Sequence, residues 1–248
     1  MRLLNAQNLN LVTFLDSEIP EYAILSHTWG NEEVTFDDML GKGSPDYRQK
    51  PGFSKIEGCR LKTLEKGLKW FWIDTCCIDK SSSAELTEAI NSMYKWYGRA
   101  RCCFALLSDV GVFKMSVSLN KTFQESRWFT RGWTLQELLA PSEILFFDGM
   151  WYYIGTRTQL CRGISEATGI DKPFIESRPA FRPFACIALK LSWASRRATS
   201  REEDMAYCLM GLFDVNMPLL YGEGGNKAFQ RLQHELIRNQ YDHTIFVW

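Results

Sequence analysis

The sequence predicts an α/β protein with an open, mostly parallel sheet flanked by helices, followed by a mainly helical C-terminal subdomain. Up to residue 150, short apolar segments alternate with helical patterns. Such segments are typical of strands covered on both faces, as in a parallel sheet. Beyond Trp151, strand patterns become sparse and helical patterns dominate. We therefore expect a core at residues 1–150 and a helical extension at residues 151–248 that packs on it.

The first half of the chain contains two predicted strands and two predicted helices. Residues 22–26 form an apolar strand that ends at a polar, glycine-containing loop. Residues 53–69 are predicted as a helix with an imperfect apolar stripe, and residues 70–74 form the next buried strand. The helix predicted at residues 84–99 begins after a capping signature formed by Ser82 and Glu85. The apolar stripes expected on the two helices are Ile56, Leu61, Leu64 and Leu68 on the first, and Leu86, Ile90, Met93, Tyr94 and Tyr97 on the second.

Two further strands and four further helices are predicted downstream. Strands are expected at residues 102–108 and 143–147, with a short helix at residues 133–140 that Pro141 ends. Helices are expected at residues 184–197, 201–213 and 226–240. The last of these places Phe229, Leu232, Leu236 and Ile237 on one face, and Pro173, Pro179 and Pro183 indicate a connecting segment before these helices.

Composition excludes several classes of protein. The 248 residues are 46% hydrophobic, and 29 basic residues balance 29 acidic ones. This composition rules out global disorder, and a net charge of zero provides no general attraction to nucleic acid or an anionic membrane. No apolar run approaches the ~20 residues of a membrane span, and the N-terminus lacks a secretory signal, so we expect a soluble, cytoplasmic protein.

Metal and disulfide sites are not expected. The eight cysteines include the adjacent pairs Cys76-Cys77 and Cys102-Cys103, which lie in apolar, strand-like segments and suit buried thiols. The chain has only three histidines and no pair of cysteines separated by two residues. Neither pattern is typical of a zinc site.

Three sequence blocks stand out: residues 22–30 (YAILSHTWG), 72–79 (WIDTCCID) and 127–138 (RWFTRGWTLQEL). In this order they closely resemble the HET (heterokaryon incompatibility) domain of filamentous fungi. Residues 203–211 (EDMAYCLMG) and 220–224 (LYGEG) resemble the segment that follows these blocks in long HET proteins. The resemblance covers nearly the whole chain.

The resemblance implies a role in self/non-self recognition between fungal cells, in which activation leads to regulated cell death. Many members carry a nucleotide-binding switch domain and repeats, but this sequence has neither a G-x-x-x-x-G-K-[ST] loop nor repeats. The HET domain is itself similar to TIR domains, whose fold is flavodoxin-like and whose Trp-x-x-x-Glu helix matches Trp133 to Glu137. Some TIR domains cleave NAD+ with that glutamate. The resemblance therefore implies Glu137 as the catalytic residue, with NAD+ as substrate and no cofactor.

The expected chemistry requires one carboxylate near the bond that breaks. Positive charge develops on the sugar carbon when nicotinamide leaves, and nicotinamide leaves as a neutral base without a general acid. A carboxylate about 4 Å away contributes ~4 kcal/mol at an effective dielectric constant of ~20. Glu137 and Trp133 are four residues apart and share a helix face. The loops after Ser26, Asp74 and Ser108 are expected at the same edge of the sheet.

The substrate-binding candidates around Glu137 are Ser26, His27, Trp29, Gly30, Asp74, Arg127, Arg131 and Trp133. Either tryptophan that flanks the predicted site, Trp29 or Trp133, has a ring on which the pyridinium can stack. The pyrophosphate would be bound by Arg127 or Arg131, or by the backbone N–H groups of the turn at residues 29–30.

Each candidate also has a structural explanation. Glu137 is equally interpretable as a first-turn helix acid or a partner of Arg131, and Trp133 as a core residue. His27 is either a base or a strand-end residue bonded to backbone. Asp74 either orients ribose hydroxyls or caps the following segment.

Other functions remain open on sequence grounds. One is a non-catalytic module that assembles with its own kind or with a partner incompatibility protein, using Trp29, Trp96 and Trp151 as interface anchors. Another is an enzyme acting on a different nucleotide or nucleoside. TIR-like enzymes often become active on assembly, so a homo-oligomer is expected on activation. A thiol nucleophile at Cys76 or Cys77, and a phosphate cradle at the glycine-rich turn 222–225, are less well supported.

Overall fold

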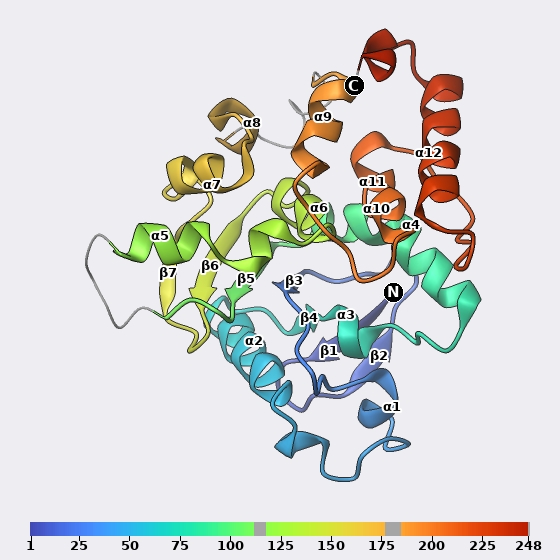
Figure 1. Cartoon of the computed structure of the whole chain (residues 1–248). Coiled ribbons are helices and arrows are strands. Elements are labelled where there is room, and N and C mark those ends of the chain that lie inside the picture. Colours follow the sequence, from blue (N-terminus) through green and yellow to red (C-terminus); the bar gives the residue numbers. More distant parts are fainter. Residues whose placement is uncertain (112–117, 177–184, 248) are drawn as a thin grey trace.

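The computed structural model describes residues 1–111, 118–176 and 185–247. Its centre is a seven-stranded sheet with the strand order β2-β1-β4-β3-β5-β6-β7 (Figure 1). The predicted connecting residues Pro179 and Pro183, and the predicted helix start at Phe184, lie outside the described residues. The strands are β1 (Arg2–Asn5), β2 (Leu11–Thr13), β3 (Tyr22–His27), β4 (Trp70–Trp72), β5 (Cys102–Leu107), β6 (Ile144–Asp148) and β7 (Tyr153–Thr156).

The four predicted strands form the parallel centre of this sheet. Strand β3 pairs in parallel with both β4 and β5, and β5 pairs in parallel with β6. All residues of β3, β5 and β6 are buried, which explains why their sequences are apolar except for Ser26, His27 and Asp148 near the strand ends. The chain runs from β3 outward to β4 and then back across β3 to β5. This reversal makes the carboxyl ends of β3 and β5 the place where open α/β sheets bind ligands.

The sheet also contains three strands that the sequence pattern did not predict. Strands β1 and β2 form an antiparallel hairpin beside β4, and β7 pairs antiparallel with β6. The sheet is therefore mixed, and parallel pairing is confined to its four central strands. Strand β7 extends the sheet beyond residue 150, while the division into a core and a C-terminal extension remains a prediction.

Helices lie on both sides of the sheet, and those of the C-terminal part gather at one end of the molecule (Figure 1). Helix α2 packs against β3 and β4, whereas α4 packs against α6 and α11. The helices are α1 (Phe36–Met39), α2 (Phe53–Glu65), α3 (Asp74–Cys77), α4 (Ser83–Arg99), α5 (Ser118–Gln124), α6 (Thr134–Leu139), α7 (Cys161–Thr168), α8 (Lys172–Glu176), α9 (Ile187–Ala194), α10 (Asp204–Tyr207), α11 (Met210–Phe213) and α12 (Gly225–Asn239), with 3-10 turns η1 (Tyr47–Gln49), η2 (Arg127–Thr130) and η4 (His243–Phe246).

Helix α4 begins where its capping signature predicts. The Ser82 side chain accepts a hydrogen bond from the backbone N–H of Glu85. The Glu85 carboxylate does not complete the capping box, because it bonds to Arg2 and to the backbone N–H of Asp79 instead. The cap therefore also ties the helix start to the N-terminal strand.

The apolar stripe predicted on α2 is only half right: Ile56 and Leu68 are buried, although Leu68 lies beyond the end of the helix. Leu61 and Leu64 are exposed, whereas Ile56, Cys59 and Thr63 face the core. The buried positions are spaced by three and four residues, as on one helix face. Thr63 is tolerated there because its hydroxyl donates to the carbonyl of Cys59 at 2.7 Å.

The cysteines are buried thiols, with one difference from the prediction. Cys102 and Cys103 lie in β5 as predicted, but Cys76 and Cys77 lie in the short helix α3 rather than in a strand. All eight cysteines are free, and each is buried except Cys186, which is half-buried.

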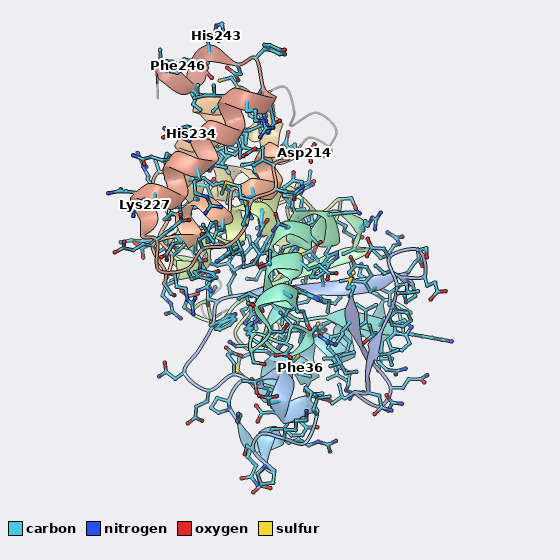
Figure 2. The ribbon with its side chains drawn as sticks, turned by 90° about the vertical axis from the view of Figure 1, so that its right-hand side faces the viewer. Phe36, Asp214, Lys227, His234, His243 and Phe246 are labelled. Atoms are coloured by element: carbon cyan, nitrogen blue, oxygen red, sulfur yellow. The ribbon has the colours of Figure 1, made fainter. Side chains whose placement is uncertain are left out.

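The helix predicted at residues 226–240 is confirmed as α12 (Gly225–Asn239), whereas the other C-terminal helices are shorter than predicted. The segment at residues 201–213 forms two short helices, α10 and α11, and Gly211 of α11 packs directly on the Tyr94 side chain of α4. In α12, Leu232 and Leu236 are buried as predicted, but Ile237 is 50% exposed. Figure 2 shows this helix, marked by Lys227 and His234, at the opposite end of the molecule from Phe36 of α1.

Within the described residues, no helix has both the length and the apolar character that crossing a bilayer requires.

Candidate functional site

A cavity of ≈ 270 Å³ opens beside the carboxyl ends of β3 and β4. Three side chains of α4, Leu86, Ile90 and Met93, form part of its apolar wall. Its polar and aromatic lining comes from His27, Trp29, Asp74, Lys80, Arg131, Trp133, Glu137, Ser200, Arg201, Asp204 and Tyr221. The cavity thus combines apolar surface with a few converging charged groups, as small-molecule sites do.

Glu137 lies on α6, a helix whose six residues are all buried. Two buried arginines hold the helix at its ends. Arg157 donates to the carbonyls of Leu138, Pro141 and Ser142 at 3.0, 2.8 and 3.2 Å. Arg197 donates to the carbonyl of Arg131 just before the helix, at 2.9 Å. These bonds satisfy carbonyl groups that the helix itself leaves unpaired, and they fix the position of Glu137.

The Glu137 carboxylate reaches the cavity but remains almost fully buried. Its side chain lines the cavity, although only 7% of the residue is exposed. Ser26 donates to its Oε2, and the Ser26 hydroxyl in turn accepts from the indole N–H of Trp128 at 2.8 Å. Burial raises the pKa of Glu137 to about 7, which the Ser26 hydrogen bond opposes and the nearby Asp74 charge reinforces. Both protonation states are therefore populated near neutral pH.

Asp74 links three residues of the cavity. Its carboxylate is 3.1 Å from Nε2 of His27, accepts from the indole N–H of Trp29 at 2.8 Å, and lies 3.9 Å from Nζ of Lys80. Burial alone raises the pKa of Asp74, but Lys80 and His27 outweigh it and hold the pKa well below its ordinary value. Asp74 is therefore an anion in the same cavity in which Glu137 readily takes up a proton.

Lys55 lies beside the imidazole ring of His27. Its Nζ lies 3.3 Å from Nδ1 of His27 and also donates to the carbonyl of Thr28 at 3.0 Å and to Glu33. Nδ1 of His27 also lies 3.3 Å from the carbonyl oxygen of Thr28, and Nε2 lies 3.1 Å from Asp74. His27 is thus bonded on both sides, which agrees better with a positioning role than with a free base.

The opposite wall of the cavity comes from the C-terminal part of the chain. Asp204 accepts from the hydroxyl of Tyr221 at 2.9 Å and from the indole N–H of Trp133 at 3.3 Å. Burial raises the pKa of Asp204. The Arg201 guanidinium lies 4.3 Å above the Tyr221 ring. No local sequence signal predicted the contact between Asp204 and Trp133.

The glycine-rich turn at residues 222–225 is not a phosphate cradle. The backbone N–H groups of Gly222 and Gly224 donate to Glu203 at 2.8 and 3.1 Å. A carboxylate of the same chain therefore occupies these donors, and it anchors the turn that carries Tyr221.

Six of the nine predicted site residues line the cavity: His27, Trp29, Asp74, Arg131, Trp133 and Glu137. Ser26 is fully buried behind Glu137 and contacts the cavity through that residue alone. Gly30 faces a different hollow, and its N–H donates to Glu33 at 2.6 Å. Arg127 is exposed outside the cavity beside Asp109. Sequence reasoning missed Lys80, Arg201, Asp204 and Tyr221.

The structure also tests the alternative explanations that the sequence left open for individual residues. Among the described residues, Glu137 forms no ion pair with Arg131, and Asp74 contacts side chains rather than capping a helix. Trp96 is buried and cannot anchor an interface. The hydrogen bond with Cys77 and burial raise the pKa of the Cys76 thiol well above its ordinary value, which argues against a thiol nucleophile.

Histidines and cysteines do not gather into a metal site. His234 and His243 belong to the C-terminal helical layer (Figure 2), whereas His27 ends β3. In the described ranges, no group of three or more histidine, cysteine or acidic residues is arranged to hold a metal ion.

Comparison with known proteins gives two matches. The family model described as "Heterokaryon incompatibility protein (HET)" matches residues 22–120. The chain is 46% identical over 225 residues to the vegetative incompatibility protein HET-E-1 of Podospora anserina, and the alignment covers 88% of this chain and 16% of that protein. The chain therefore spans about a sixth of this relative's length. No solved structure matches the chain.

Proposed function

Because the chain belongs to the heterokaryon incompatibility (HET) family, we propose that it acts in the regulated death of incompatible fungal cells by cleaving the nicotinamide–ribose bond of NAD+. The relative is named as a vegetative incompatibility protein, which supports the cellular role. The fold relationship to TIR domains belongs to the same proposal. It is supported by the order β4-β3-β5-β6, which is the order of the first four strands in flavodoxin-like sheets.

One observation carries the enzymatic proposal: a buried glutamate with a pKa near neutrality lines a cavity beside the carboxyl ends of the parallel strands. Perturbed carboxyl groups in such cavities are more common at functional sites than elsewhere. Trp29 and Trp133 line the same cavity and offer aromatic surface to a flat, cationic ring.

The cavity limits how NAD+ can be bound. At ≈ 270 Å³ it is slightly smaller than the ~300–1,000 Å³ of typical ligand pockets. We expect it to accept the nicotinamide and its ribose, while the adenosine part extends outside. Arg131 and Arg201 also line the cavity, and their guanidinium groups suit a pyrophosphate at the cavity mouth.

In the proposed reaction, the bond between ribose C1′ and the pyridinium nitrogen breaks, and its electron pair returns to the ring to give neutral nicotinamide. Positive charge develops on C1′ and the ring oxygen, and ionised Glu137 stabilises it. The positive charge of the bound pyridinium favours this ionised form. Water then adds to C1′ and transfers its proton to a base. Glu137 suits that role because its pKa lies near the working pH.

The decisive experiment measures nicotinamide release from NAD+ by purified wild-type protein and by Glu137→Gln, which keeps the shape and removes the charge. The matched control is Glu21→Gln, an exposed carboxylate outside the cavity. We expect release by wild type and control and a loss of at least about a hundredfold in Glu137→Gln. Equal turnover by wild type and Glu137→Gln would exclude Glu137 from the mechanism.

The assay needs two further conditions. Activity is measured over a range of protein concentrations, because an assembled form is the expected active species. ATP, NADP+ and nucleosides are tested in parallel, so that an enzyme acting on another nucleotide is detected. Absence of turnover with every substrate at every concentration would refute the enzymatic proposal.

A non-catalytic assembly module is the second candidate, and the turn between β6 and β7 favours it. Met150, Tyr152 and Tyr153 are 70, 54 and 50% exposed beside an edge strand of the sheet. Exposed apolar side chains at a sheet edge favour contacts between chains. Under this candidate, cell killing survives Glu137→Gln and is lost on replacing Tyr152 and Tyr153 by serine.

A further inference from the structure

A lysine of the same chain covers one face of Trp29. Nζ of Lys80 lies 3.5 Å from the centroid of the Trp29 ring. At this distance the ammonium is in cation–π contact with one face of the indole ring. Trp29 is 39% exposed and lines the cavity that also contains Glu137.

The Trp29 ring is held in place for such a contact. Its indole N–H donates to Asp74 at 2.8 Å, and Asp74 is itself bonded to His27 at the end of β3. The same carboxylate lies 3.9 Å from Nζ of Lys80. A fixed ring and a fixed anion therefore together form a preformed cation site, and Lys80 fills it.

We propose that Lys80 is a resident cation that occupies the pyridinium-binding face of Trp29 and leaves as a cationic ligand ring enters. The inference rests on the proposed function and deepens it by naming the ligand class. The site selects rings with a delocalised positive charge, as in oxidised nicotinamide nucleotides, over neutral rings, as in the reduced ones. Lys80 lowers the affinity for a cationic ligand, because an entering cation must displace Lys80 from its contacts with Trp29 and Asp74.

A neighbouring cavity offers carboxylates to the displaced ammonium group of Lys80. Trp29 and Lys80 also line a second cavity, of ≈ 230 Å³. That cavity includes the carboxylate residues Glu33, Asp37 and Asp79. A rotation of the lysine side chain therefore exchanges one set of negative partners for another. Burial lowers the pKa of Lys80, and the nearby Asp74 charge opposes this shift.

The test compares 1-methylnicotinamide, a cation that has no ribose to cleave, with neutral nicotinamide. Ligand-observed NMR titrations give the affinity of each for wild-type protein, Lys80→Met and Lys80→Gln. We expect both variants to bind the cation about two- to fivefold more tightly than wild type and to bind nicotinamide unchanged. Trp29→Leu should abolish the preference for the cation. Thermal unfolding confirms that each variant is folded.

Lys62→Met is the matched control, because Lys62 also lies over an aromatic ring, 5.6 Å from the centroid of Phe147, but outside this cavity. It should bind the cation as wild type does. Weaker or unchanged cation binding by both Lys80 variants would overturn the proposal. ADP-ribose is titrated in the same way. If the Lys80 variants lose affinity for ADP-ribose without gaining affinity for the cation, the proposal is also overturned, because Lys80 would then be an anion ligand. None of these measurements requires turnover, so the inference and the enzymatic proposal can fail separately.

Discussion

Replacing Glu137 by glutamine should stabilise the protein relative to wild type, and more so at pH 8 than at pH 5. The Glu137 carboxyl has a pKa of about 7 in the folded protein because burial disfavours its charged form, whereas its ordinary value is 4.5. Between these values the folded protein holds a proton that the unfolded chain releases. The free energy of unfolding of wild type therefore falls as the pH rises from about 4.5 to 7.

The size of the effect follows from the two pKa values. Their difference corresponds to roughly 3 kcal/mol of lost stability once the pH exceeds 7, and most of it, about 2–3 kcal/mol, develops between pH 5 and pH 8. Glutamine cannot ionise, so Glu137→Gln lacks this loss. For a chain of this size, the effect corresponds to about 5–10 °C in Tm.

The assay is urea unfolding of wild type and Glu137→Gln at pH 5 and pH 8. The altered hydrogen bond with Ser26 changes the free energy of unfolding at both pH values. The difference between the pH 5 and pH 8 results therefore reports the ionisation of Glu137. Glu21→Gln, an exposed change, should follow wild type at both. A stability difference between Glu137→Gln and wild type that is the same at pH 5 and pH 8, within about 0.5 kcal/mol, would refute a buried Glu137 with a raised pKa.

Four further substitutions test the packing of the fold, each by urea unfolding. Leu236→Ala should cost about 2–5 kcal/mol and Ile237→Ala less than about 0.5 kcal/mol, because only the former is buried; equal costs would contradict the assigned face of α12. Arg157→Met should cost about 2–4 kcal/mol, because three carbonyls after and within α6 lose their donor; a neutral effect would contradict the anchoring of that helix. Gly132→Ala should cost about 1–3 kcal/mol, because the added methyl would lie 2.5 Å from Cγ2 of Thr199; unchanged stability would show that this contact relaxes freely.

The central strands were predictable because burial on both faces leaves a direct signal in the sequence. β5 is uniformly apolar, β3 is apolar up to Leu25, and every residue in both strands is buried. The outer strands leave no such signal. In β2, for example, two of three residues are exposed, and the strand exists because it pairs with β1.

Helix faces were predicted less reliably because more than one face of a helix carries apolar side chains. Leu61 and Leu64 are apolar yet exposed on α2, while the polar Thr63 is buried with its hydroxyl bonded to backbone. Which row is buried depends on where the helix packs against the sheet. That is a tertiary property, and local periodicity does not record it.

The candidate site was predictable where its residues follow strands and unpredictable where they come from distant segments. His27 and Asp74 come just after or at the ends of β3 and β4, so parallel strand order alone places them together. Asp204 reaches the cavity through contacts with Trp133 and Tyr221, which no local pattern encodes. Lys80 lies immediately after one of the recognisable blocks, yet its position over Trp29 depends on how the chain turns after α3.

The most direct test of the central claim is a crystal structure of Glu137→Gln with NAD+ bound. We predict the nicotinamide ring against Trp29, with ribose C1′ next to the residue 137 side chain inside the cavity between β3, α4 and the turn that carries Tyr221. Binding of the dinucleotide elsewhere, or with C1′ turned away from residue 137, would contradict the assignment of this carboxyl group as the one that acts on the ribose.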